Sequence, residues 1–134
     1  MTDLLLCKPF QCKVSSVLNR NVKEYGKKFL TDGKEDTCWN SEQGRPQWVS
    51  IAFEEEQSVS EIRLMFQGGF AGKNCQLQIE ENKQTFDFFP EDSNKLQTFC
   101  LPQPLSGKIF RITFPESSDF FGRITLYQLS LIGG

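Results

Sequence analysis

Short segments in which apolar and polar residues alternate, separated by turn residues, constrain this sequence more than any other feature. In residues 47–53, Val49, Ile51 and Phe53 fall on one face, because successive side chains of a strand point to opposite faces. Comparable segments lie at residues 10–17, 59–66, 75–79, 86–89, 96–101, 109–114 and 123–132. About eight such strands, with no amphipathic helix, predict an all-β antiparallel sandwich in which residues 1–134 form a single domain.

The connections between these segments predict where the strands end. The acidic run at residues 54–57 is expected to be the solvated end of a hairpin, and Pro102 and Pro104 are expected to break the chain. Trp39 and Trp48 are both expected to be largely buried, because large aromatic rings supply much of the area that a core buries.

Composition argues against several classes of function. The sequence has no histidine, which removes the usual general base and a common ligand of zinc. The cluster of Asp87, Glu91 and Asp92 beside Pro90 is better explained as a solvated turn. We therefore expect no catalytic residues and no enzymatic activity.

The charge and hydropathy of the chain argue against two further partners. Lys and Arg are spread along a chain of net charge −2, which predicts no direct nucleic-acid groove. No apolar run reaches the ~18 residues of a membrane span.

The cysteines indicate a reducing compartment. There are five, at positions 7, 12, 38, 75 and 100, and none forms a CxxC pair. Asp3 stands where a signal peptide carries a basic residue, and the apolar run that follows is short, so secretion is not expected. We expect free thiols, several of them buried, and no intramolecular disulfide.

A polar turn at residues 32–41 precedes the strand at residues 47–53. Asp32 and Gly33 are strong turn formers, because Asp can bond its own backbone and Gly can take a positive φ. Thr37 and Trp39 are two residues apart and point the same way on an extended chain. Such a turn either holds itself together by hydrogen bonds or holds a cation.

The residues of this region carry a resemblance to a known family. Asp32-Gly33, Asp36-Thr37, Trp39 and Gln47-Trp48-Val49, followed by an alternating strand, resemble the discoidin superfamily, which includes coagulation-factor C-domains and galactose-binding modules of glycosidases. The resemblance implies an eight-stranded jelly-roll β-sandwich with neighbouring chain ends.

The resemblance also implies a structural calcium ion in the turn. Its ligands would be the carbonyls of Phe29, Lys34 and Tyr127, the Asp32 side chain, the Thr37 hydroxyl and carbonyl, and the side chain at position 128. The family has a carboxylate at that last position, whereas this chain has Gln128. An amide supplies a dipole but no charge, so we expect weaker calcium binding here. The alternative is a turn held only by hydrogen bonds of Asp32 and Thr37.

A narrower resemblance concerns four segments, at residues 15–21, 37–41, 66–70 and 119–123. They are similar to a family of small vertebrate proteins associated with an orphan nuclear receptor. This likeness implies a protein of the nucleus, and also of the cytoplasm, that binds the receptor or another protein partner and represses its transcriptional activity. We expect the protein to be a monomer.

The loops offer residues for either of two binding functions. Exposed Arg, Asn and Phe side chains suit a protein interface, in which Arg and aromatic residues often dominate the binding energy, and they also suit a sugar site. The candidate partner- or ligand-binding residues are Arg20, Asn40, Phe70, Phe121 and Arg123. Of Phe120 and Phe121, at least one ring is expected to face the core. We favour a protein-interaction module over the alternative, a carbohydrate-binding module with a structural calcium site.

Overall fold

The computed structural model describes residues 1–34 and 36–134. Its elements in chain order are β1 (Thr2–Asp3), α1 (Leu4–Cys7), β2 (Phe10–Val14), η1 (Leu18–Arg20), α2 (Val22–Tyr25), η2 (Lys27–Leu30), β3 (Trp39–Asn40), β4 (Gln47–Phe66), β5 (Gly72–Lys73), β6 (Cys75–Ile79), β7 (Thr85–Phe88), β8 (Leu96–Phe114), β9 (Glu116–Ser117) and β10 (Thr125–Gly133). Among these residues, none of the helices is long and apolar enough to cross a membrane.

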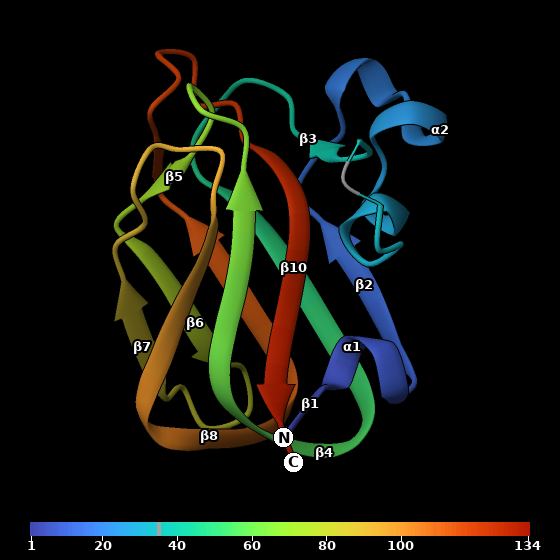
Figure 1. The fold of residues 1–134 in the computed structure, drawn as a ribbon, viewed down its shortest axis with the longest axis vertical. Coiled ribbons are helices and arrows are strands. Elements are labelled where there is room, and N and C mark those ends of the chain that lie inside the picture. The colour runs from blue at the N-terminus through green and yellow to red at the C-terminus, as the bar shows by residue number, and fades with distance from the viewer. Residues whose placement is uncertain (35) are drawn as a thin grey trace.

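The strands form two layers (Figure 1). One layer contains β2, the first half of β4, the second half of β8, β6 and β7, in that order. The other contains β10 beside the second half of β4, which pairs in turn with the first half of β8. The short strands β1 and β3 also pair with β10, and β5 pairs with β9. All of these pairs are antiparallel, so the predicted antiparallel β-sandwich is confirmed.

The two long strands β4 and β8 pass through both layers. Their register shifts between Ala52 and Gln57 on β4, and again where Val59 and Glu61 face Leu105 and Cys100 on β8. Such bulges bend a strand without ending it, and bent strands form the corners between packed sheets.

The prediction of a hairpin end at residues 54–57 and of a break at Pro102 and Pro104 is therefore wrong. Both prolines lie in the bulge of β8, where they have no partner in the register with β4. A proline at such a position removes no hydrogen bond from the ladder, so the strand continues through it.

The apolar core fills the space between the layers. Val49 and Ile51 line one side, and Leu64 and Phe66 line the other, each fully buried. The ring of Phe114 meets the ring of Phe66 edge-on, with centroids 5.7 Å apart. Further buried residues of the core include Phe53, Ile62, Phe88, Phe110, Ile112, Leu126, Leu129 and Leu131. The sequence alternation correctly predicts these inward faces.

The two tryptophans differ in their environment. Trp39 is fully buried as predicted, and its indole Nε1–H donates to the Ser16 carbonyl at 2.8 Å. Trp48 is also mostly buried, as predicted, but it keeps partial exposure at the surface. Because Val49 points inward, Trp48 points outward, where the Arg111 guanidinium lies 4.3 Å from the centroid of its ring.

The two ends of the sandwich carry different features. At one end the chain termini lie side by side, because β1 pairs with β10 and Thr2 faces Gly133 (Figure 1). The opposite end carries the loops at residues 41–46, 67–71 and 118–124, which we call the apical loops. The segment from η1 to η2 lies beside β2 and β3 at one edge of the sandwich (Figure 1).

Candidate functional site

Backbone hydrogen bonds join the apical loops into one surface. The Gly44 amide donates to the Phe121 carbonyl at 2.8 Å, and the Ser118 amide donates to the Ala71 carbonyl at 2.9 Å. Ser41 and Ile124 exchange two bonds, from the Ser41 amide to the Ile124 carbonyl and from the Ile124 amide to Ser41 Oγ. The loops are therefore braced against one another before any partner binds.

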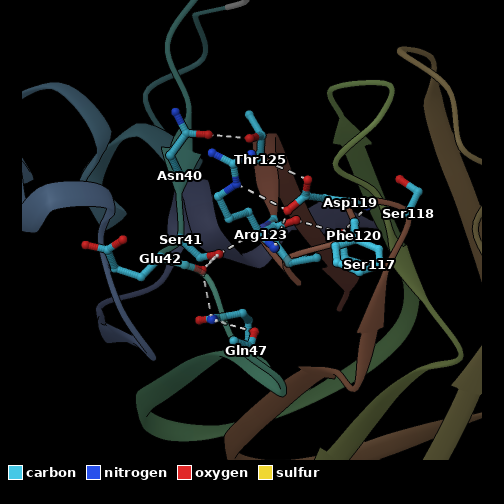
Figure 2. Close-up of polar contacts among 12 residues, drawn as sticks. Asn40, Ser41, Glu42, Gln47, Ser117, Ser118, Asp119, Phe120, Arg123 and Thr125 are labelled. Atoms are coloured by element: carbon cyan, nitrogen blue, oxygen red, sulfur yellow. Dashed lines mark hydrogen bonds and ion pairs between the residues drawn. The ribbon is translucent and has the colours of Figure 1, made fainter.

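Arg123 and Asp119 form the centre of this surface (Figure 2). The Arg123 amide and its Nε both donate to Asp119 Oδ2, at 3.0 and 3.2 Å, and Nη2 donates to Oδ1 at 3.5 Å. Ser117 Oγ donates to the Arg123 carbonyl and accepts from the Asp119 amide, so the two ends of the loop are tied together. The guanidinium therefore has a fixed direction, which reduces the entropy cost of using it in binding.

The Asp119 carboxyl responds to this environment. Burial raises its pKa, but the hydrogen bonds and the charge of Arg123 outweigh burial. The pKa of Asp119 consequently lies below its usual value, and the carboxylate stays ionised at neutral pH.

Gly122 allows the tight turn between Asp119 and Arg123. Its φ is +84°, and an added Cβ would lie 2.7 Å from the Gly44 carbonyl oxygen. The same Cβ would lie 2.9 Å from Arg45 Cγ, and Arg45 Nη2 donates to the Phe120 carbonyl at 2.7 Å. A side chain at position 122 would push these two loops apart.

Two phenylalanines project from this turn into solvent. Phe120 is 83% exposed and Phe121 is 52% exposed, and their rings meet edge-on with centroids 5.3 Å apart. The expectation that at least one ring faces the core is wrong. The bonds from Arg45 and Gly44 to the carbonyls of Phe120 and Phe121 hold this backbone at the outer rim, away from the space between the layers.

Three of the predicted binding residues line one small cavity. Asn40, Phe70 and Arg123 lie around a space of about 180 Å³, together with Leu18, Ser41, Gln67 and Thr125. The Arg123 guanidinium lies 5.3 Å from the Phe70 ring and 5.9 Å from the Phe121 ring, which places Phe121 beside this cavity. Arg20 is exposed on η1 and is not among the residues that line the cavity.

Asn40 is engaged inside the protein. Its Oδ1 accepts a hydrogen bond from the Thr125 hydroxyl, and Figure 2 shows the two side chains pointing toward each other. The Arg123 guanidinium is likewise engaged, because its Nε forms an ion pair with the Asp119 carboxylate. The exposed rings therefore present more unused contact surface than the polar groups do.

Sequence reasoning missed Gln47, which organises the loop at residues 41–46. It is 4% exposed, its Oε1 accepts from the hydroxyls of Ser15 and Ser16, and its Nε2 donates to the carbonyls of Glu42 and Gly44, each at 3.0 Å. The alternation of residues 47–53 could have predicted that Gln47 is buried, because Gln47 lies on the same inward face as Val49. A buried amide needs partners for all its polar atoms, and the loop supplies them.

The turn proposed for calcium is closed by its own side chains. Asp32 Oδ1 accepts from the Lys34 amide at 3.0 Å, and Oδ2 accepts from the Thr37 hydroxyl at 2.6 Å. Burial raises the pKa of Asp32, but the bonds from Thr37 and Lys34 outweigh it and lower this pKa below its usual value. These bonds satisfy the carboxylate without a cation.

The other proposed ligands lie on different elements. Gln128 on β10 shares a cavity of about 160 Å³ with Thr31 and Gly33, so the turn and the last strand do lie side by side. Tyr127 is the extra residue of a bulge in β10 and has no partner in the register with β4. Phe29 lies on η2, where the Lys28 ammonium is 5.0 Å from its ring. In residues 1–34 and 36–134, no three Asp, Glu, Cys or His side chains gather as a metal site.

Comparison with known proteins places the chain in a family. Residues 11–126 match the model of the F5/8 type C domain. "Nuclear receptor 2C2-associated protein" of Danio rerio is 51% identical over 99% of this chain and 97% of its own length. The human protein of that name is 43% identical, over 99% of this chain and 98% of its own.

Solved structures of low sequence identity share the fold. Chitosan-binding module 1 from a chitosanase/glucanase of Paenibacillus sp. IK-5 is 19% identical and superimposes with a TM-score of 0.78, over 99% of this chain and all of that one. The family 32 carbohydrate-binding module of C. perfringens NanJ, solved with galactose, is 17% identical and gives a TM-score of 0.73, over 91% of this chain and 92% of that one. The chain thus belongs to the F5/8 type C (discoidin-like) domain family and, within it, to the family of the nuclear receptor 2C2-associated proteins.

Proposed function

We propose that this domain is a protein-interaction module that docks a nuclear receptor through Phe120, Phe121 and Arg123. One observation carries the proposal: two adjacent aromatic rings project into solvent from a loop whose backbone is fixed by Arg45, Gly44 and the pair Asp119–Arg123. Exposed aromatic residues on a rigid support are the usual anchors of protein interfaces. Their ordering cost is low because these hydrogen bonds already hold the backbone of the free loop.

The names of the relatives support a nuclear receptor as the partner. Relatives over 40% identical along nearly the whole chain are named for association with nuclear receptor 2C2. We propose that this chain binds the same class of receptor in the nucleus, and also in the cytoplasm, and that binding represses receptor-driven transcription. A receptor-responsive reporter in cells tests the repression, and imaging of the tagged chain tests the compartment.

Paired substitutions test the docking surface. Phe120→Ser with Phe121→Ser should weaken binding to purified nuclear receptor 2C2 by about 1–3 kcal/mol for each ring that acts as a hot spot. Phe89→Ser is the matched control, because Phe89 is 68% exposed on a different loop. It should leave receptor binding unchanged. Titration calorimetry measures the affinities, and thermal unfolding verifies that all variants remain folded.

The result of this experiment decides the assignment. If the double variant binds the receptor as tightly as the parent does, Phe120 and Phe121 are not part of the receptor interface. Arg123→Ala is less selective, because it also removes the partner of Asp119 and should lower both affinity and stability.

A carbohydrate site is the second candidate, supported by the cavity among Asn40, Phe70 and Arg123. An aromatic ring beside amide and guanidinium groups suits a sugar, and the structural neighbours include a module solved with galactose. Titration with galactose separates the two functions. A sugar site predicts saturable binding that is lost in Phe70→Ala, whereas the receptor proposal predicts no binding of galactose.

A structural calcium ion in the turn at residues 29–37 is a further proposal, which rests on the resemblance described above. The suitable groups are Asp32, Thr37, the bulge residue Tyr127 and nearby Gln128. However, Asp32 already accepts two hydrogen bonds, and position 128 brings no charge. If calcium binds, the melting temperature should rise with added calcium, by the equivalent of about 2.7 kcal/mol at a hundredfold excess over Kd.

The Gln128→Glu variant sharpens this test. It restores a carboxylate and should tighten calcium binding. A melting temperature that neither calcium nor a chelator changes, in both the parent and Gln128→Glu, would mean that hydrogen bonds alone hold the turn.

A further inference from the structure

A groove unrelated to the apical loops lies beside β2. We call it the lysine groove; its volume is about 490 Å³, against about 180 Å³ for the apical cavity. It is lined by Lys13, Val14, Val17, Val22, Lys23, Gly26, Lys27, Lys28 and Trp48. Figure 1 shows the elements concerned, with α2 and its neighbours standing beside β2 at the edge of the sandwich.

The floor of the groove is apolar. Val14 on β2, Val17 just beyond it and Trp48 on β4 are half-buried, and Val22 on α2 is 60% exposed. Trp48 lies here because it points outward from its layer, with the Arg111 guanidinium on its ring. The floor therefore offers apolar contact area to a partner side chain.

Gly26 shapes one wall. An added Cβ would lie 2.4 Å from the Val22 carbonyl oxygen, so only glycine lets the chain turn back directly after α2. This turn brings Lys27 and Lys28 on η2 to the same groove as Val22 and Lys23 on α2.

The rim is cationic. Lys13, Lys23, Lys27 and Lys28 are all exposed, and no carboxylate lines the groove. None of their ammonium groups forms an ion pair with an acidic residue that the structure describes. The chain as a whole carries a net charge of −2, so this concentration of positive charge is local. Its potential favours anionic groups above the apolar floor.

We propose that the lysine groove binds an acidic, amphipathic peptide segment of a partner protein. The charge of the rim matches carboxylates, and the valines and Trp48 match apolar anchors between them. A small molecule is the poorer occupant, because its orientation needs precisely directed polar groups. Here the polar side chains of the lining are four flexible lysines.

Synthetic peptides and intrinsic fluorescence test the proposal. The probe is a short peptide of Glu, Leu and Phe with apolar residues at helical spacing; its controls are a scrambled peptide and a peptide of Glu alone. Trp48 lines the groove whereas Trp39 is fully buried, so emission from Trp48 should report occupancy. The change should disappear in Trp48→Phe. Binding should weaken as salt rises from about 0.05 M to about 0.5 M.

Charge reversal locates the site. Lys23→Glu with Lys27→Glu should weaken binding of the amphipathic peptide by on the order of tenfold or more. The matched control is Lys73→Glu with Lys95→Glu, which makes the same change at exposed lysines outside the groove. Val22→Ser should weaken binding through the floor, while Leu96→Ser, at a comparably exposed residue elsewhere, should not.

Several outcomes would overturn the proposal. It is wrong if the amphipathic peptide shows no binding up to about 1 mM, or binds both charge-reversed variants equally. It is also wrong if the peptide of Glu alone binds as tightly, if ATP or inorganic phosphate binds more tightly, or if the domain prefers phosphatidylserine vesicles. None of these results depends on the apical loops, so the receptor proposal can fail separately.

Discussion

At the scale of single residues, Gly122 shows how one position can determine the shape of a site. Gly122 and Gly69 both have a positive φ, of +84° and +90°. The space around the two glycines differs. A Cβ added at position 69 would have no atom within 4 Å, whereas a Cβ added at position 122 would clash with the Gly44 carbonyl oxygen. Gly69→Ala should cost about 1–2 kcal/mol of stability, from backbone conformation alone. Gly122→Ala should cost more, and urea unfolding measures the difference. Equal costs would show that the loops move apart freely.

The Asp119 carboxyl should make the stability of the folded protein depend on pH. Its pKa is lowered in the folded protein, so the unfolded state binds more protons in acid. The stability it contributes is therefore present above the unfolded value, about 3.9, and is lost as pH falls through the lower folded pKa. Asp119→Asn should flatten the fall in stability in this acidic range, and Arg123→Ala should flatten it similarly. A parent-like acid profile in both variants would exclude a role for this pair.

At the scale of elements, the burial of each cysteine within or beside its element predicts how fast the thiol reacts. Burial raises the pKa of Cys75 on β6 to about 12 and that of Cys12 on β2 to about 11, although Lys27 lowers the latter somewhat. Cys7 and Cys100 are exposed. In the native protein iodoacetamide should modify Cys7 first, then Cys100, whose pKa is raised by its hydrogen bond to Glu61, and Cys75 last. Under denaturing, non-reducing conditions the mass should show five modified thiols, and fewer would reveal a disulfide.

The strands were predictable from the sequence, but their connections were not. Alternation correctly located all eight main segments, because burial between layers imposes a period of two. The charged run of Glu54, Glu55 and Glu56 and the prolines after residue 101 suggested strand ends, because these residue types are rare inside paired strands. They lie instead at bulges that bend β4 and β8 from one layer into the other, and this depends on pairing between residues far apart in sequence.

The candidate site was predicted in part. Asn40, Phe70 and Arg123 do come together, and residue type alone suggested them. Burial of Gln47 and exposure of both apical phenylalanines were missed, because each depends on a hydrogen bond between residues far apart in sequence. The alternation also placed Trp48 correctly, on the face of the strand opposite that of Val49 and Ile51.

At the scale of the whole molecule, β4 and β8 make the two layers a single folding unit. Each strand contributes residues to both layers, so neither layer can separate without breaking the other. Unfolding in urea should be two-state, with the emission of buried Trp39 and the far-ultraviolet circular dichroism changing together. Phe66→Ala, in the centre of the core, should lower stability by roughly 3–5 kcal/mol while keeping these transitions coincident. Separate transitions would contradict the shared-strand argument.

The pairing of β1 with β10 has a practical consequence for orientation. Both chain ends emerge at one pole of the molecule, and the apical loops occupy the other (Figure 1). A resin, a sensor chip or a fused domain attached at either end would therefore hold the molecule upright, with Phe120 and Phe121 directed into the medium. Immobilised through one end or through the other, the domain should capture the same partner with equal capacity.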